Sequence, residues 1–143
     1  MRTLYFAHPV NVYNTPLEQK LLREISIIFS AWDIENPNQP HHQEGYKTWK
    51  KEKGNGMLYY FEDVLPKMDG GIGLTFLDGK FGKGVAGELE FLFKAGKPIW
   101  EINNSGIISI IYSLGTERIL DVEQTKQRIY IDGEFSKGIK PYL

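Results

Sequence analysis

The residues best placed to carry chemistry are two glutamates, Glu88 and Glu90, which follow a glycine-rich stretch at positions 82–87. The apolar run at positions 71–77 predicts a buried strand before this stretch. Gly96 predicts the end of the helix that follows it, and residues 98–102 predict the next strand. In such a strand–loop–helix–strand unit, the first turn of the helix faces the mouth of a parallel sheet, where ligands bind. A carboxylate there could act as a nucleophile or as an acid–base group.

Helical periodicity does not choose between the two glutamates. Each of them flanks the apolar stripe of the expected helix, which consists of Val85, Leu89, Leu92 and Phe93. Both are also acceptable as ordinary surface acids, because the helix dipole favours negative charge near a helix N-terminus. On the pattern of residues alone, either glutamate is a candidate.

The same stretch has the spacing of the dinucleotide-binding fingerprint, Gly82-x-Gly84-x-x-Gly87. Glu101 lies close to the place of the acid that would bind an NAD ribose. That fingerprint, however, normally occupies the first strand–helix turn of a six-stranded fold, and too little chain follows it here. We therefore expect no nicotinamide cofactor, and no other cofactor is predicted.

Other catalytic chemistry finds little support in the sequence. The absence of cysteine excludes disulfides, thiolate metal sites and cysteine nucleophiles, and no G-x-S-x-G serine motif occurs. His41 and His42 are neighbours in sequence, so we do not expect both to face one ion, and no metal site is predicted. His8, which precedes Pro9 at the end of the first expected strand, is better placed to contact a ligand.

Several elements are expected to position these residues. Residues 3–7 form an apolar run that predicts the first strand, and residues 33–36 predict a short second strand. Between them, Thr15, Pro16 and Glu18 predict a helix start with a capping box.

The rest of the chain is divided as follows. Residues 37–56 are interpreted as irregular, either a lid or binding loop or a surface excursion with one helical turn. Apolar spacing over residues 57–68 predicts an amphipathic helix, and residues 107–112 predict a fully buried strand. Asp121 is expected to cap a final short helix, and residues 133–143 to wrap the surface or contact a neighbouring subunit.

Strands that alternate with helices predict an α/β protein with a mostly parallel sheet covered on both faces. Right-handed crossovers and only five strands favour a flavodoxin-like doubly wound sandwich with strand order 2-1-3-4-5. A single domain over residues 1–143 is the simplest organisation for this length. The first and third strands are neighbours in this order, so residues 5–8 are expected to share a pocket mouth with residues 78–88.

Composition narrows the possible partners. The net charge of -1 gives no reason to expect binding to a nucleic-acid polymer or to a membrane surface. No signal peptide and no apolar run of transmembrane length is recognisable, so a cytoplasmic protein is expected. Aromatic residues make up 13% of the chain, which indicates a well-filled core, a stacking pocket, or both.

Four segments carry a resemblance to a known family. They are Thr3-Leu4-Tyr5-Phe6-Ala7, Met68-Asp69, Gly84-Val85-Ala86-Gly87-Glu88-Leu89 and Ala95-Gly96-Lys97-Pro98-Ile99. Over roughly residues 3–102 the chain resembles the nucleoside 2-deoxyribosyltransferase family and its nucleotide N-glycosidase relatives. The resemblance implies that Glu88, rather than Glu90, attacks the anomeric carbon of the sugar and displaces the base. It also implies that Tyr5 positions this glutamate.

The resemblance further implies a small-molecule nucleoside or nucleotide as substrate. Backbone N–H groups around Gly82 and Gly84 are expected to bind a 5′-phosphate if the substrate carries one. Aromatic side chains such as Tyr46 are expected to stack on the base. The first loop differs from the small, glycine-rich loop of the family, and its residues His8 and Asn11 are predicted substrate contacts.

The chain departs from the family at two groups that hold the sugar or its phosphate. Phe61 and Gly82 stand where the family often has polar or acidic side chains, and Asp63 and Asp78 are the candidate substitutes. The sequence therefore predicts an N-ribosyl bond-cleaving enzyme, either a deoxyribosyltransferase or an N-glycoside hydrolase. The alternative is a non-catalytic nucleotide-binding or interaction module on the same fold. A homodimer or higher homo-oligomer is expected, because the family is usually oligomeric and closed symmetry is common.

Overall fold

The computed structural model describes all 143 residues, which form a five-stranded sheet with the order β2-β1-β3-β4-β5. The strands are β1 (Arg2–Ala7), β2 (Trp32–Glu35), β3 (Gly70–Leu74), β4 (Ile99–Ile102) and β5 (Ile108–Ile110). All neighbouring pairs are parallel except β4 and β5, which are antiparallel. The predicted α/β flavodoxin-like architecture and strand order are confirmed.

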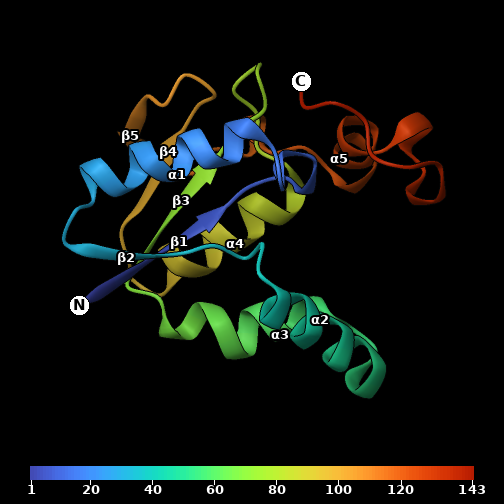
Figure 1. Cartoon of the computed structure of the whole chain (residues 1–143), viewed down its shortest axis with the longest axis horizontal. Coiled ribbons are helices and arrows are strands. Elements are labelled where there is room, and N and C mark those ends of the chain that lie inside the picture. The colour runs from blue at the N-terminus through green and yellow to red at the C-terminus, as the bar shows by residue number, and fades with distance from the viewer.

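Helices cover both faces of this sheet (Figure 1). They are α1 (Pro16–Ile28), α2 (Pro40–Lys53), α3 (Met57–Tyr59), α4 (Lys83–Lys94) and α5 (Val122–Ile129). The chain stays helical after α3, through a π turn at Tyr60–Val64 and a 3-10 turn at Leu65–Lys67. Figure 1 shows α1 on one side of the sheet and α4 with the α2–α3 pair on the other, while α5 lies beyond the carboxyl ends of the strands.

Side chains of the central strand β1 lie alternately on the two faces of the sheet, because successive side chains of a strand point to opposite sides. Leu4 and Phe6 belong to the apolar cluster beneath α1. Tyr5 and Ala7 belong to the cluster beneath α4 and the helical segment after α3. This alternation directs the Tyr5 side chain towards α4.

Two glycines of β3 allow α4 to lie close to the sheet. A Cβ atom at Gly71 would stand 2.5 Å from a methyl group of Leu92, and one at Gly73 would stand 2.5 Å from a methyl group of Leu89. Both distances are far below van der Waals contact, so a side chain at either position would force these leucine side chains of α4 to shift. The glycines therefore help to set the distance between Glu88 and β1.

The segment at 37–56 was expected to be irregular, and this prediction is wrong. The 14 residues of α2 occupy most of it, with Pro40 in the first turn. Gly54 ends the helix with a φ of 76°, which is the left-handed conformation that glycine adopts most easily. The amphipathic helix expected at 57–68 is present as α3 and its π and 3-10 extensions.

Two smaller expectations also need correction. Thr15 caps α1 by accepting a hydrogen bond from the Glu18 N–H, but the Glu18 carboxylate turns inwards instead of returning to Thr15 to complete a capping box. The strand expected at 107–112 is the short antiparallel edge strand β5, and Ile110 is 45% exposed. By contrast, Asp121 and Gln124 do form the capping box of α5.

The C-terminal segment wraps across the carboxyl end of the sheet, as one of the two alternatives for residues 133–143 predicted. Phe81 and Ile119 form a parallel bridge, the Leu77 N–H donates to the Leu143 carbonyl, and the Tyr142 hydroxyl donates to the Thr75 carbonyl. The mouth of the sheet is therefore partly covered by the chain itself. None of the helices is both long enough and apolar enough to cross a membrane.

Candidate active site

Tyr5 and Glu88 meet where β1 and β3 lie side by side. The Tyr5 hydroxyl donates a hydrogen bond of 2.5 Å to Glu88 Oε2. Both residues are buried, with 1% of Tyr5 and 8% of Glu88 exposed. The strand order predicted that these two residues would come together, and they do. Glu90 instead faces solvent on the outer side of α4, where it pairs with Lys94 at 2.6 Å.

Burial dominates the electrostatics of Glu88. Loss of hydration raises the pKa of its carboxyl group from 4.5 to about 7, while the Tyr5 hydrogen bond acts in the opposite direction by favouring the anion. A carboxyl group that titrates near neutral pH is poised either to attack as the anion or to donate a proton as the acid.

Two further tyrosines, Tyr13 and Tyr60, surround the same carboxylate. Burial raises the pKa of each phenol above its ordinary value, and the negative charge of Glu88 is the next cause in both. Burial also raises the pKa of Tyr5, followed by the Glu88 charge and the hydrogen bond. Neither Tyr13 nor Tyr60 was a predicted site residue for catalysis. Tyr13 could have been found from its place in the loop after β1, at the carboxyl end of the sheet.

His8 lies behind this group and is not free to contact a ligand. Its Nδ1 atom is 2.9 Å from the Phe6 carbonyl oxygen and its Nε2 atom is 2.8 Å from Glu18 Oε2. The ring stacks on Phe6 and touches Tyr13. Burial by itself would raise the pKa of Glu18, but hydrogen bonds from His8, Asn14 and Asn38 bring it below its ordinary value. His8 therefore packs against Tyr13 while its ring is held by the buried Glu18 carboxylate.

Asn11 and Asp78 both hold the C-terminal segment. The Asn11 amide donates to the carbonyl groups of Arg128 and Lys140, and its buried Oδ1 atom has no partner. Asp78 accepts two hydrogen bonds from Arg128, at 3.0 and 2.7 Å. These bonds are the main reason that the pKa of Asp78 falls to about 2. Both residues thus have structural partners in the chain.

The glycine-rich turn is capped from within the protein. Gly82 precedes the first turn of α4, and the next N–H, that of Lys83, donates to the Thr125 hydroxyl at 2.9 Å. Gly84, one residue further, is exposed, and a Cβ added there would meet nothing within 4 Å. Of the two glycines expected to bind a phosphate, only Gly84 faces open space. Thr125 was not foreseen, because nothing in the sequence links α5 to this turn.

Tyr46 and Asp63 lie on the helical wall formed by α2 and α3. The Tyr46 ring is 6.4 Å from that of Tyr60, centroid to centroid, so it belongs to the aromatic group that reaches Glu88. Asp63 is exposed and 3.5 Å from Lys67. It lines a separate cavity of about 350 Å³, to which Glu88 does not contribute.

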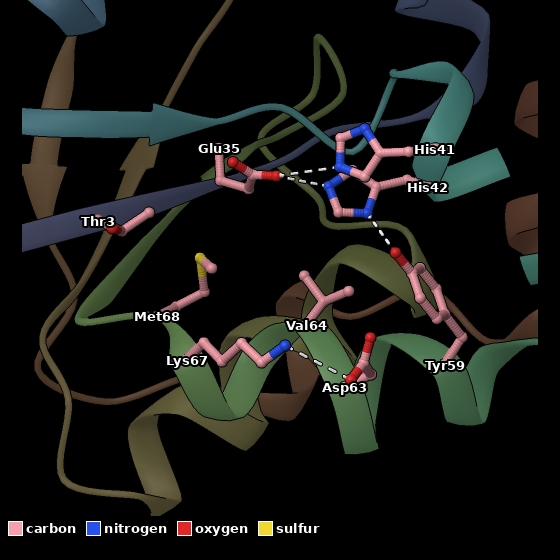
Figure 2. A pocket seen from close by; sticks show the side chains of 9 residues that line it. All are labelled: Thr3, Glu35, His41, His42, Tyr59, Asp63, Val64, Lys67 and Met68. Atoms are coloured by element: carbon pink, nitrogen blue, oxygen red, sulfur yellow. Dashed lines mark hydrogen bonds and ion pairs between the residues drawn. The ribbon is translucent and has the colours of Figure 1, made fainter. Parts of the chain in front are cut away.

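That cavity contains a group of side chains that sequence reasoning dismissed (Figure 2). The Nε2 atoms of His41 and His42 both face Glu35 Oε1, at 3.9 and 2.5 Å. Adjacent histidines were not expected to face one ion, but here both rings face the same carboxylate oxygen. Their rings lie with centroids 4.0 Å apart, because rotation about the side-chain bonds lets both rings converge. A second cavity, of about 220 Å³, is lined by Glu101 and Arg118, which form an ion pair.

Comparison of the chain with models of protein families, with curated proteins and with solved structures gives no match.

Proposed function

We propose that the protein cleaves the N-glycosidic bond of a nucleoside or nucleotide, with Glu88 as the nucleophile and Tyr5 as its positioning residue. The observation that carries this proposal is the 2.5 Å hydrogen bond from the Tyr5 hydroxyl to the buried Glu88 carboxylate. The family resemblance over residues 3–102 supports the same two residues. Tyr5 lies in the carboxyl half of β1, and Glu88 lies in the second turn of α4, the helix that follows β3. Doubly wound proteins bind ligands beyond the carboxyl ends of such neighbouring strands.

The proposed reaction has two steps. Glu88 Oε1, the carboxylate oxygen that Tyr5 does not hold, attacks the anomeric carbon. The bond to the base nitrogen breaks, and the base leaves with the electron pair and takes up a proton from solvent. The glycosyl ester on Glu88 is then attacked by water in a hydrolase, or by a second base in a transferase. In either case the Glu88 carboxylate is released unchanged.

Access to Glu88 requires local movement, since only 8% of the residue is exposed. Besides Tyr5, the phenols of Tyr13 and Tyr60 also feel its charge. Both lie on segments outside the sheet, Tyr13 in the first loop and Tyr60 at the start of the π turn. Displacement of these rings would open the carboxylate and leave aromatic faces against which a base can stack.

The experiment that tests the proposal is an assay for free base over a panel of ribo- and deoxyribonucleosides and their 5′-monophosphates, with and without an acceptor base. Release of base without an acceptor indicates hydrolysis, and exchange of base indicates transfer. If no member of the panel is cleaved, the proposal fails.

Replacement of Tyr5 with phenylalanine is expected to slow base release by about ten- to a hundredfold, because one hydrogen bond to a charged acceptor, worth roughly 1–3 kcal/mol, is lost. The same bond favours ionised Glu88, so the pH at which activity reaches half its maximum should rise above that of the wild type, which is expected near 7. A merely structural role would change the rate without moving this pH. Activity profiles from pH 5 to 9 distinguish the two roles.

A second candidate function is a non-catalytic nucleotide-binding module. This function is favoured because two predicted substrate contacts already have partners within the chain. Asp78 binds Arg128, and the Lys83 N–H donates to Thr125. Nucleotide binding without base release, measured by calorimetry with the same panel, would support this reading. Loss of that binding on substitution of the exposed Gly84 would locate it at the first turn of α4.

Self-association stays a prediction. Large apolar side chains are exposed at the end of α1, where Ile27 is 71% exposed, and after β5, where Tyr112 is 81% exposed. Burial of such side chains in a two-fold interface would stabilise a dimer. Sedimentation at micromolar concentration is expected to give a species of twice the 16.4 kDa chain mass. A 16.4 kDa species alone would contradict the prediction.

A further inference from the structure

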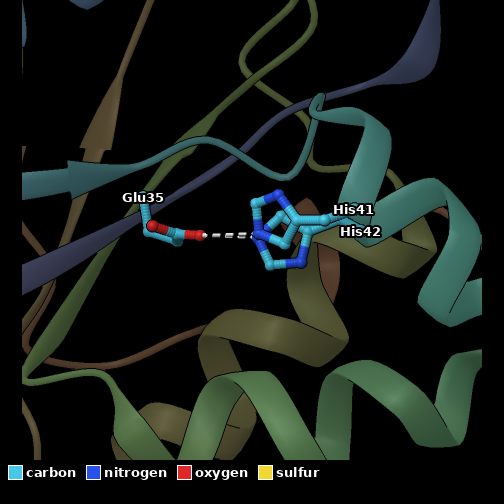
Figure 3. Close-up of side chains that lie close together, drawn as sticks. All are labelled: Glu35, His41 and His42. Atoms are coloured by element: carbon cyan, nitrogen blue, oxygen red, sulfur yellow. Dashed lines mark hydrogen bonds and ion pairs between the residues drawn. The ribbon is translucent and has the colours of Figure 1, made fainter.

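Three side chains with metal-binding groups converge beside the larger of the two cavities described above (Figure 3). Glu35 is the last residue of β2, and His41 and His42 belong to the first turn of α2. The potential ligand atoms, one from each side chain, all lie within 4.8 Å of one another. Figure 3 shows the two imidazole rings turned towards the same carboxylate oxygen. These three residues are called the Glu–His–His cluster below.

The spacing of the cluster suits a small divalent ion. Zinc bonds of about 2.0–2.2 Å to imidazole nitrogen and carboxylate oxygen place two ligands of a tetrahedral site roughly 3.4 Å apart. The distances from Glu35 Oε1 to Nε2 of His42 and of His41 are 2.5 and 3.9 Å, one shorter and one longer than that value. Small rotations of the Glu35 and His41 side chains, both of which are partly or fully exposed, would make the two distances equal.

The buried member of the cluster is oriented as metal-binding histidines usually are. His42 Nδ1 is 2.7 Å from the Tyr59 hydroxyl, and the residue is only 4% exposed. Ligating histidines commonly use their second nitrogen to donate to an oxygen in this way, which fixes the ring and the position of its proton. With an ion on Nε2, the His42 proton would reside on Nδ1 and would be donated to Tyr59.

The cavity beside the cluster has space for an ion that keeps some of its coordination positions open. The cavity of about 350 Å³ is lined by the cluster, by Asp63 and by Lys67, among others (Figure 2). Three protein ligands with further positions open to solvent or substrate are the pattern of catalytic rather than purely structural zinc sites. Glu35 offsets one positive charge of a dication, and the ion pair of Asp63 with Lys67 in the same cavity adds no net charge.

We propose that the Glu–His–His cluster binds one divalent transition-metal ion, with Zn²⁺ as the best fit to its two imidazoles and one carboxylate. Imidazole ligands favour zinc, cobalt, nickel and copper over magnesium and calcium, which prefer sites made of oxygen alone. The ion joins the carboxyl end of β2 to the start of α2. His42 connects the ion to Tyr59 through a hydrogen bond, and Tyr60, the next residue, lies near Glu88.

Calorimetric titration of the metal-free protein with Zn²⁺ is expected to give one equivalent per chain, and Mg²⁺ under the same conditions is expected to give no heat of binding. Titration with Co²⁺ should produce visible absorption bands typical of a low-coordinate site. Zinc should also raise the thermal unfolding temperature, because an ion that binds only the folded state stabilises it.

Variants locate the ion. His41→Ala, which removes a ligand whose side chain is 64% exposed, should weaken zinc binding by at least about a hundredfold without affecting folding, and Glu35→Gln should do the same. Tyr59→Phe, which removes only the partner of His42 Nδ1, should weaken binding by about ten- to a hundredfold. The control is Glu44→Gln, an exposed acid on α2 outside the cluster, which should bind as the wild type does. Absence of zinc binding in the wild type, or undiminished binding in both His41→Ala and Glu35→Gln, would overturn the proposal.

Discussion

Glu88→Gln is expected to abolish base release, with a loss of more than about a thousandfold, because the amide keeps the shape of the side chain but lacks the nucleophilic oxygen. The Tyr5 hydroxyl can still donate to the glutamine carbonyl, so the protein should fold and the aromatic surroundings should persist. The measurement is the rate of base release on the best substrate from the panel, with near-ultraviolet circular dichroism as the check on folding.

Glu90→Gln is the matched control, because it makes the same chemical change two residues further along α4. Glu90 is paired only with Lys94 on the outer face, and exposed pairs of this kind contribute little. Its rate should stay within about threefold of the wild type. Equal activity of the wild type and Glu88→Gln would refute the mechanism, whatever the result for Glu90→Gln.

The second large effect is expected in the pH dependence of folding stability, and it needs no substrate. The pKa of Glu88 is about 7 in the folded protein and 4.5 as its reference value in an unfolded chain. Between these two values the folded state binds more protons than the unfolded state, so the free energy of unfolding falls as the pH rises. The contribution of Glu88 is fully present below about pH 4.5 and is lost above about pH 7, and its size is about 3 kcal/mol.

Glu88→Gln removes this titration. The unfolding free energy of the variant minus that of the wild type should therefore increase by about 3 kcal/mol as the pH rises from 4 to 8. Urea unfolding at a series of pH values measures the difference, and Glu90→Gln should show no gain of this kind, because the Lys94 partner lowers the pKa of Glu90. Parallel stability curves for the wild type and Glu88→Gln would show that the buried carboxyl group does not titrate as described.

The fold was predictable because its signals are local and repeated. The apolar runs predict strands β1 and β3, and the helical spacing of apolar residues predicts helices α1 and α4. The rules for crossovers then predict the order of the strands in the sheet. Once β1 and β3 are neighbours, residues 5–8 lie near the start of α4, which the strand order predicted. The choice of Glu88 over Glu90 came from the family resemblance, because helical periodicity leaves both glutamates open.

Helix α2 was missed because it has no apolar stripe to mark it. Its boundaries nevertheless carry signals that could have been used, since Pro40 suits the first turn and Gly54 suits the left-handed residue after the last. The missed helix in turn concealed the Glu–His–His cluster, because two adjacent histidines in a loop give no reason to look for a carboxylate at the end of β2.

Other features of the site depend on tertiary contacts that no local pattern records. Asp78 and Arg128 are 50 positions apart, and Lys83 and Thr125 are 42 apart. Either pair could have been a substrate contact until the C-terminal segment was placed across the carboxyl ends of the strands. The antiparallel direction of β5 was equally hidden, because an apolar run does not distinguish an edge strand from a central one.

The alternation along β1 means that substitutions at positions 4 and 6 affect one face of the sheet, and substitutions at positions 5 and 7 affect the other. Positions 4 and 6 are held by the cluster under α1, whereas positions 5 and 7 face the cluster that contains the candidate site. Substitutions on the two faces share few neighbours, so their effects on stability should be nearly additive. A lineage could therefore explore new pocket chemistry at positions 5 and 7 while positions 4 and 6 continue to specify the same sheet, which makes the strand a natural starting point for directed evolution.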